Sequence, residues 1–557
     1  MLRGLSPTGD SIGGTSDRPR RCDLSPSLIA AVGIGGLILI GAAKYVSLVA
    51  RSRAIEDLRR FAVVRYEHEG PYRSWHFNGE RVEVLESRPE PALEPSVMGE
   101  AGLVEQSRIE LDCRPSSAEP WLARLFGPEC FGHVRSVDFV QMVRCIGRKG
   151  SEGSEPNDQT LALLGRLPEV RWLNLSGHSF TDAGMVHVGR LSRLERLWLR
   201  GTPITDQGLM HLRNLRRLKV LDLDSTGVTD EGLRYLASFT LLRELYLEGT
   251  RVTDHGLKEL AGLTSLRKLE LPALEGRGLH YLAGLSELEE LSLWVTKADP
   301  NLPAGLAQLP APANLRTLTL QGAGITDTGM LGVGRTQTLE NLTLFGTEVS
   351  DDGLEGLRQC GMLRRLRIMK SRISGRGLAY LSSLPRLEVL FLWETPLVAE
   401  QLASLPVLQQ LRVLHLPQCS VGPEATQWIG RLPELEELNL VGNDLDDMCL
   451  RWLRNRRLRR LCVAGNPRIS DAGLAQLPDL PELRELSLAG TRITDSGLAG
   501  LRRFARMEKL DLSETAISDA GLAPLMELKN LREVTLVGTR VSQTGREKLR
   551  VQLGSRR

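Results

Sequence analysis

The chain has 557 residues, of which 41% are hydrophobic and 25% are charged, so it is long enough to bury a large core. Its formal net charge of +3 does not supply the strongly basic surface that nucleic-acid binding requires, and we expect no nucleic-acid partner. The eight cysteines are scattered along the chain and show no disulfide framework.

The N-terminal part changes abruptly from polar to apolar. Residues 1–25 are rich in Gly, Ser and Arg, which is typical of a disordered tail. Residues 26–50 contain a long uncharged run followed by Lys44, whose ammonium group can reach back to a membrane surface. This predicts a single transmembrane helix that anchors the protein through Leu28 to Ala50.

A cleaved signal peptide is the alternative interpretation of this segment, because Gly41 and Ala43 form a small-x-small cleavage pattern. More basic residues follow the segment than precede it, and the positive-inside rule then favours a cytoplasmic C-terminus. The signal-like N-terminus favours export instead. We expect a single-pass membrane protein whose C-terminal part faces the periplasm or the extracellular space.

Three short regions follow the hydrophobic segment. Residues 51–88 predict a small pre-domain with a helix and a hairpin that turns at Asn78 and Gly79. Residues 89–112 are rich in Pro and Glu and predict a linker. Residues 113–169, with a strand at Val134 to Phe139, predict the cap that covers the first apolar layer of a repeat array.

Residues 170–557 repeat one unit, which is clearest from Leu194 to Arg217. Leu194, Leu197 and Leu199 have the spacing L-x-x-L-x-L, which turns three apolar side chains of a short strand to one side. Thr202 follows where the chain leaves the strand, and its hydroxyl can bond the backbone there.

The second half of the unit predicts a short helix. Asp206 is the candidate N-cap, and Leu209, Leu212 and Leu215 form one apolar stripe behind it. One unit cannot bury its apolar face alone, so stacked copies must share a continuous core. The predicted fold is therefore an α/β solenoid with a curved parallel sheet inside and short helices outside.

Sixteen copies occur, and most begin twenty-four residues apart. Their first positions are Val170, Leu194, Leu218, Leu242, Leu266, Leu288, Leu315, Leu339, Leu363, Leu387, Leu411, Leu435, Leu458, Leu483, Met507 and Leu531. The spacing is irregular between Pro272 and Asn314, where prolines replace helix signals. We expect the solenoid to bend or loosen there.

These repeats resemble the leucine-rich repeat family, and the phrase T-D-x-G-L resembles its cysteine-containing, F-box-associated subclass. The phrase occurs at Thr205 to Leu209, Thr229 to Leu233, Thr253 to Leu257 and Thr494 to Leu498. The chain departs from that subclass because Thr dominates the position where the subclass has Cys or Asn. Cys419, Asn443 and Asn466 are the exceptions. An apolar N-terminal segment before a single solenoid is also similar to membrane-anchored bacterial leucine-rich repeat proteins.

The concave face of the sheet is the predicted binding surface. The third, fifth and seventh positions of each repeat point out of the sheet, and seven of these forty-eight positions are aromatic, against about two expected from the chain-wide 4%. Phe345, Met369, Phe391 and Trp393 lie on three consecutive strands and predict one apolar patch. The alternative is that these side chains only pack on one another and shield the sheet.

Basic residues accompany this patch. Arg365 and Arg367 lie on the same strand as Met369. The predicted partner-binding residues are Trp294, Phe345, Arg365, Arg367, Met369, Phe391 and Trp393. A dense basic turn from Arg454 to Arg460 indicates either a solvated surface or a site for an anionic peptide, glycan or phosphate.

No catalytic, cofactor or metal motif is visible in the sequence. The P-loop and H-E-x-x-H patterns are absent, and His187 and His211 have no evident third ligand. We therefore expect a non-enzymatic, membrane-tethered scaffold that binds another protein through its concave face. The alternatives are an F-box-like substrate adaptor in ubiquitin-type targeting and an exported receptor for an anionic glycan or peptide.

Overall fold

The computed structural model describes residues 75–77, 80–82, 111–112, 133–134, 136–138, 157–164, 170–296, 314–403 and 405–554. The chain forms two compact units, Met1–Val134 and Arg135–Arg557. The predicted tail, the predicted membrane segment Leu28 to Ala50 and most of the predicted linker lie outside the described residues. Within the described ranges, no helix is long and apolar enough to cross a membrane.

The first unit contains two described strand pairs. β1 (Trp75–Phe77) pairs antiparallel with β2 (Glu80–Val82), as the hairpin predicted around Asn78 and Gly79 requires. β3 (Leu111–Asp112) pairs antiparallel with β4 (His133–Val134).

The second unit is built on one parallel sheet, in which each strand pairs with its sequence neighbours from β5 to β21. β5 (Ser136–Asp138) lies within the strand predicted at Val134 to Phe139. The following strands are β6 (Trp172–Asn174), β7 (Arg196–Trp198), β8 (Val220–Asp222), β9 (Glu244–Tyr246), β10 (Lys268–Leu274), β11 (Glu290–Val295), β12 (Thr317–Gln321), β13 (Asn341–Phe345), β14 (Arg365–Met369), β15 (Val389–Trp393), β16 (Val413–His415), β17 (Glu437–Asn439), β18 (Arg460–Cys462), β19 (Glu485–Ser487), β20 (Lys509–Asp511) and β21 (Glu533–Thr535).

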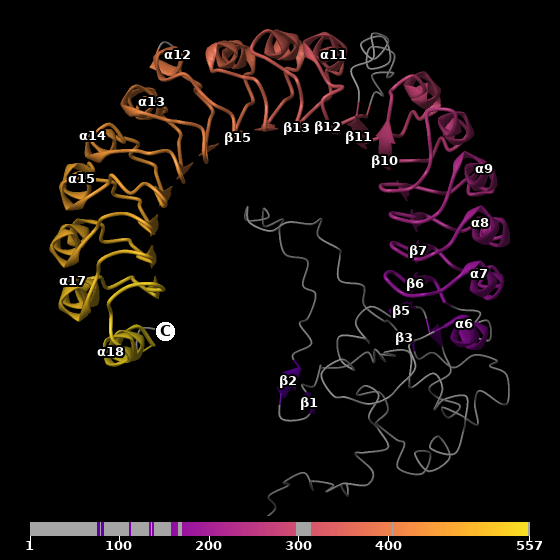
Figure 1. Ribbon diagram of the computed structural model, residues 1–557, viewed down its shortest axis with the longest axis horizontal. Coiled ribbons are helices and arrows are strands. Elements are labelled where there is room, and N and C mark those ends of the chain that lie inside the picture. Colours follow the sequence, from indigo (N-terminus) through magenta and orange to yellow (C-terminus); the bar gives the residue numbers. More distant parts are fainter. Residues whose placement is uncertain are drawn as a thin grey trace, which may run out of the picture. The chain divides into compact units, whose positions relative to one another are not determined.

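Each of the sixteen predicted repeats thus contributes one strand, and β6 to β21 begin at or beside the third position of their repeats. The strands line the inner side of an arc, and the helices line its outer side (Figure 1). The ladder continues through β10, β11 and β12, although the β10–β11 register shifts between Glu270 and Ala273. Residues 297–313, where prolines replace the helix signals, lie outside the described part.

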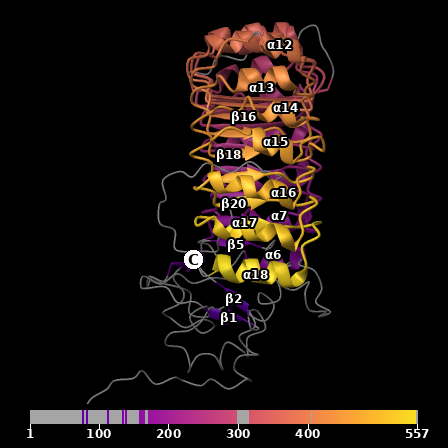
Figure 2. The same cartoon turned by 90° about the vertical axis from the view of Figure 1, so that its left-hand side faces the viewer.

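The helices are short, and several are 3-10 helices (η). They are α6 (Asp158–Leu164), α7 (Asp182–Val188), α8 (Asp206–Leu212), α9 (Asp230–Leu233), η1 (Arg234–Ser238), η2 (Gly256–Leu260), η3 (Leu279–Gly284), α11 (Asp327–Val333), η4 (Asp352–Gln359), η5 (Arg376–Ser383), α12 (Ala399–Ala403), α13 (Pro423–Ile429), α14 (Asp447–Leu450), α15 (Asp471–Gln476), α16 (Asp495–Leu498), η6 (Ala499–Arg503), η7 (Asp519–Gly521), α17 (Leu522–Glu527) and α18 (Gln543–Gly554). α12 to α18 stack one above another on the outer side (Figure 2).

The core lies between the sheet and the helices. Leu194, Leu197 and Leu199 are fully buried, as are Leu209 and Leu212 of the adjoining helix. The predicted repeat phase is therefore confirmed. Thr202 also acts as predicted, because its hydroxyl donates to the Leu199 carbonyl over 2.6 Å.

The predicted N-cap at Asp206 is wrong by one residue. Thr205 is the N-cap, and its hydroxyl accepts from the backbone N–H of Gln207 over 3.3 Å. Asp206 is the first helical residue, and its carboxylate accepts from the backbone N–H and the hydroxyl of Thr229 in the next repeat, over 2.8 and 2.7 Å. The Asp of one repeat therefore orients the Thr of the next.

The glycine of T-D-x-G-L belongs to the same contact. A Cβ on Gly232 would lie 2.2 Å from Oδ1 of Asp206, closer than such atoms can approach. The pattern recurs from the Asp158–Thr181 pair to the Asp519–Ser542 pair. The Thr, the Asp and the Gly of the phrase are thus explained by one contact between consecutive repeats.

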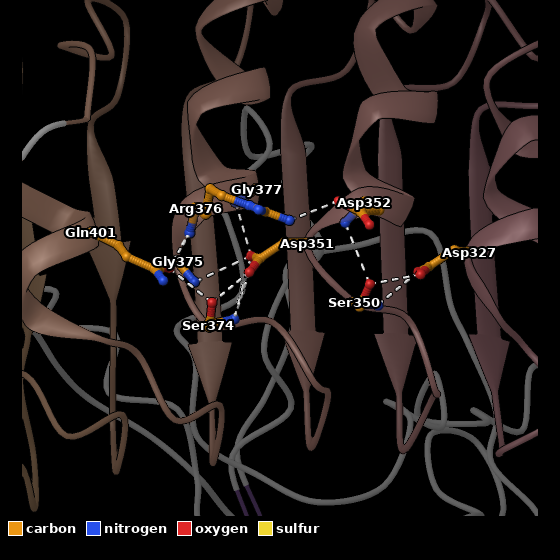
Figure 3. A network of polar contacts seen from close by, with 9 residues as sticks. All are labelled: Asp327, Ser350, Asp351, Asp352, Ser374, Gly375, Arg376, Gly377 and Gln401. Carbon is orange, nitrogen blue, oxygen red and sulfur yellow. Dashed lines mark hydrogen bonds and ion pairs between the residues drawn. The ribbon is translucent and has the colours of Figure 1, made fainter.

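Figure 3 shows where this pattern changes. The Asp327 carboxylate accepts from Ser350 in the usual way. Two repeats later, Gly375 occupies the position that Asp327 and Asp351 hold in their repeats. Asp351 accepts from the backbone N–H and the hydroxyl of Ser374 as usual, and it also accepts from the backbone N–H groups of Gly375 and Gly377. With glycine at position 375, the side-chain oxygen of Gln401 in the following repeat lies 2.8 Å from the Ser374 hydroxyl and accepts from the Arg376 backbone N–H over 2.7 Å. A neutral amide therefore joins the usual aspartate at this step.

Candidate partner-binding surface

Five seventh-position residues form a continuous row across the concave face. The strand register places Trp294, Gln321, Phe345, Met369 and Trp393 opposite one another, from β11 to β15. Trp294 is 42% exposed, and the other four are half-buried. We call these five residues the seventh-position row.

The fifth positions form a second row beside it. Thr343, Arg367, Phe391 and His415 lie opposite one another on β13 to β16. The rings of Phe391 and His415 meet edge to face with their centroids 5.8 Å apart. Phe345, Met369, Phe391 and Trp393 therefore lie on neighbouring positions, which is the predicted arrangement of the patch.

His415 supports this patch, and the sequence reasoning did not single it out. Its side chain is 3% exposed, and Nε2 lies 2.8 Å from a carboxylate oxygen of Glu437. Burial, together with the Arg460 and Arg367 cations, lowers the pKa of His415 to about 4. The ring is therefore neutral at pH 7, and Nε2 donates because the carboxylate only accepts. His415 is the fifth residue of the repeat that begins at Leu411, and this position alone predicts that it lies on the concave face beside Phe391.

The two arginines of β14 differ in their surroundings. Arg365 Nη1 donates to the Asn341 side-chain oxygen over 3.3 Å. Arg367 is half-buried, and its guanidinium forms no hydrogen bond or ion pair with any of the described residues. Burial and the neighbouring Arg365 cation lower the pKa of Arg367. Its neighbours on the adjoining strands, Thr343 and Phe391, are uncharged.

The eighth position of each repeat adds a rim to this surface. Glycine is frequent there and adopts positive φ, as at Gly346 and Gly442. Lys370, Glu394 and Gln418 instead hold φ values of 53°, 47° and 55°, which is costly for residues with a Cβ. They surround Trp393. Gln418 accepts from its indole N–H over 2.9 Å, and Lys370 Nζ lies 5.3 Å from its ring centroid.

An acidic cluster occupies another part of the same face. Carboxylate oxygens of Asp224, Glu248 and Glu270 lie within 4.8 Å of one another. Burial raises the pKa of Asp222 to about 6 and, together with the Asp222 charge, raises that of Asp224 to about 7. The concave face is therefore acidic at β8 to β10 and basic at β14.

The basic turn from Arg454 to Arg460 is largely neutralised. Arg457, Arg459 and Arg460 form ion pairs with Glu434, Glu436 and Glu437, respectively. Arg454 instead stacks on the half-buried Trp452 ring, with its guanidinium carbon 5.6 Å from the ring centroid. This leaves a weaker anion-attracting surface than the sequence implies.

A shallow hollow of about 270 Å³ lies on β17 to β21, away from the predicted patch. It forms where the fifth-position side chains are small, as at Asn439, Cys462 and Ser487. Its charged borders are internally paired, because Arg460 contacts Glu437 and Lys509 contacts Glu485.

Comparisons with known proteins agree with this architecture. A family described as "Leucine-rich repeat region" matches residues 129–377, and one described as "Leucine Rich repeat" matches residues 481–501 and 507–526. These matches lie on the repeats and on part of the predicted cap. The chain is a leucine-rich repeat protein.

Solved structures share low sequence identity with the chain. An internalin from Listeria monocytogenes is 19% identical, with 70% of this chain and 92% of that chain covered and a TM-score of 0.35. A leucine-rich repeat protein of Leptospira interrogans is 20% identical, with 70% and 90% covered and a TM-score of 0.45. A chain of the mouse RP105/MD-1 complex is 18% identical, with 68% and 73% covered and a TM-score of 0.47. No curated protein matches the chain.

Proposed function

We propose that this protein is a recognition scaffold that binds a partner protein on its concave face. The contact residues are Trp294, Phe345, Arg365, Arg367, Met369, Phe391 and Trp393. The observation that carries this proposal is the seventh-position row, in which aromatic and Met side chains remain partly exposed on consecutive strands. Rigidly held aromatic and arginine side chains are the groups that most often dominate binding energy at protein interfaces.

Binding without turnover is the activity that this surface supports. The one histidine at its edge, His415, is neutral and already donates to Glu437. A general base needs a reachable nitrogen and a pKa near the working pH. Burial holds the pKa of His415 well below that range, so we assign it a role in positioning Phe391.

The membrane anchor Leu28 to Ala50 completes the proposed scaffold, with the repeats exported. N-terminal sequencing of the mature protein tests the anchor, since a new terminus near Lys44 would identify a cleaved signal peptide. Protease protection of intact cells tests the orientation. The alternative of an exported receptor for an anionic glycan or peptide has less support, because Arg457, Arg459 and Arg460 of the basic turn are already paired with glutamates. The F-box-like adaptor has no supporting contact in the described residues.

Site-specific photo-crosslinking tests the concave face directly. A photoreactive phenylalanine analogue replaces Phe345 or Trp393 in the full-length protein, and the control places it at Val186, an exposed position on the outer helix α7. We expect both concave positions to crosslink one common protein in native cells, and the outer position not to do so. Equal crosslinking of that protein from Val186 would contradict the proposal.

A further inference from the structure

We infer that the partner presents an acidic segment, and that Arg367 receives one of its carboxylates with apolar partner side chains packed beside it. This inference rests on the proposed function and specifies the chemistry of the partner. Arg367 differs from the other basic residues of the concave face because its guanidinium has no partner among the described residues.

Arginine and lysine residues at the third, fifth and seventh positions are otherwise engaged in the described repeats. Arg196 stacks on Trp172, Arg200 pairs with Asp224, Lys268 with Glu270, Arg365 bonds Asn341, Arg460 pairs with Glu437 and Lys509 with Glu485. Arg367 alone among them has no such partner in the described residues. A partly desolvated cation without a counter-charge is unfavourable in the free protein, and an incoming carboxylate would relieve that cost.

The neighbours of Arg367 specify what must accompany the carboxylate. Phe391 lies opposite Arg367 on β15, and Met369 lies two residues further along β14, between Phe345 and Trp393. Side chains two residues apart on a strand are separated by about 6.6 Å. An extended partner segment with an acidic residue and an apolar residue at positions i and i+2 has the same spacing. The surface therefore matches the pattern acidic-x-apolar.

The charge distribution along the concave face favours binding of an acidic segment at β14 over binding at β8 to β10. From β10, the near end of the acidic cluster, to β14 there are four strand steps, or about 19 Å at ~4.8 Å per step. This exceeds the Debye length of about 8–10 Å in physiological salt, so the acidic cluster on β8 to β10 does not cancel the cations of β14. An acidic segment is attracted to β14 and repelled from Asp222, Asp224 and Glu270.

The rim residues support the same conclusion independently. Lys370 follows β14 directly and holds a positive φ that glycine would hold at lower cost. Residues held in such conformations by their surroundings often cluster at functional sites. Glu394 pairs with Lys370 over 3.5 Å and Gln418 holds Trp393, so the rim orders the side chains around the patch.

Three synthetic peptides test the inference by fluorescence anisotropy with the full-length protein. They contain repeated Glu-Thr-Leu-Thr, Gln-Thr-Leu-Thr or Lys-Thr-Leu-Thr, so only the charge differs. We expect the Glu peptide to bind at least about tenfold more tightly than the Gln peptide, and the Lys peptide to bind most weakly. Equal affinities, or no binding of the Glu peptide at about 1 mM, would overturn the inference.

Arg367→Met and Arg367→Lys locate the binding site, and Lys509→Met is the matched control on the same face. We expect Arg367→Met to weaken Glu-peptide binding about tenfold or more and to bring it to the level of the Gln peptide. Arg367→Lys should retain part of the affinity, because it keeps the charge but loses the two-pronged geometry. Wild-type affinity in Arg367→Met, at unchanged thermal stability, would contradict the assignment.

The photo-crosslinking experiment separates this inference from the proposed function. A common crosslink from Phe345 and Trp393, combined with no preference among the peptides, would leave the concave face as the binding surface and reject the acidic partner. Selective, Arg367-dependent binding of the Glu peptide without such a crosslink would reject the protein scaffold and retain the carboxylate site.

Discussion

At the scale of single residues, contacts between consecutive repeats explain the sequence phrase T-D-x-G-L. The Asp206 carboxylate needs two donors from Thr229 and a neighbour without a side chain, and Gly232 provides that neighbour. The Thr, the Asp and the Gly of the phrase therefore act across repeats, although each looks like a local helix signal when it is considered alone.

Gly232→Ala is expected to destabilise the protein by about 1–3 kcal/mol, because its Cβ would clash with Oδ1 of Asp206. Gly262→Ala is the matched control. No atom lies within 4 Å of the Cβ position of Gly262, so this change should stabilise by roughly 0.4–1 kcal/mol through the unfolded chain. Thermal or urea unfolding measures both. Equal effects of the two substitutions would show that the contact between repeats is not the cause.

The acidic cluster makes stability depend on pH. In the unfolded chain an aspartate titrates near 3.9, whereas burial raises the pKa of Asp222 to about 6 in the folded protein. Between these pH values the folded state retains a proton that the unfolded state has released, so the free energy of unfolding falls as pH rises from about 4 to about 6. The proton-linked stabilisation is absent above that range.

Asp222→Asn should therefore raise stability at pH 8 by on the order of 1–3 kcal/mol and change it little at pH 4. The substitution suits the backbone, because Asn174 and Asn439 occupy the same repeat position and accept the same backbone hydrogen bond. Unfolding midpoints from pH 4 to pH 8 provide the test. A wild-type pH profile in the variant would refute the assignment to this carboxyl.

Within the repeat, the eighth position lowers the stability of the protein wherever a residue other than glycine adopts a positive φ there. Lys370, Glu394 and Gln418 adopt left-handed backbone conformations on three consecutive repeats beside the patch. Glu514, with φ 54°, does the same in a repeat remote from the patch. The left-handed conformation costs a residue with a Cβ roughly 1–2 kcal/mol relative to its ordinary states.

Lys370→Gly, Gln418→Gly and Glu514→Gly should each raise the free energy of unfolding, by about 0.5–1 kcal/mol. Only the first two are expected to weaken partner or Glu-peptide binding, because their side chains contact Trp393. Melting temperatures and peptide affinities measured on the same samples separate the two effects. Weaker binding in Glu514→Gly would show that the loss is not specific to the rim.

At the scale of the whole molecule, the solenoid obtains its stability from the layer between sheet and helices and leaves the concave face available for recognition. Leu344, Leu366 and Leu392 are fully buried on the side of the patch strands that faces the helices. Phe345 and Trp393 lie on the opposite side of the same strands and stay partly exposed. Recognition and folding therefore use different faces.

The double variant Phe345→Ala/Trp393→Ala should change the melting temperature little, because truncating outward residues removes little buried area. Phe239→Ala is the core control, since Phe239 is fully buried, and it should cost about 3–5 kcal/mol. Calorimetry or thermal circular dichroism gives both values. A large loss in the double variant would mean that the patch is structural packing.

The architecture could be predicted from the repeat period alone, because a solenoid repeats a local pattern. The spacing of Leu194, Leu197 and Leu199 is enough to define a strand, its inward face and its stacking partners. The same period also predicted that Phe345, Met369 and Trp393 share one surface, since equivalent positions of successive repeats must lie side by side.

The partners of the polar side chains, in contrast, could not be predicted before the fold was known. Asp206 looked like a cap for its own helix, but its acceptor oxygens bind Thr229. Arg367 is unpaired among the described residues, and Arg457 is paired with Glu434, although both lie in basic stretches of sequence. Hydrogen bonds and charges depend on distances of a few ångströms between residues more than twenty positions apart, and the repeat period does not encode those distances.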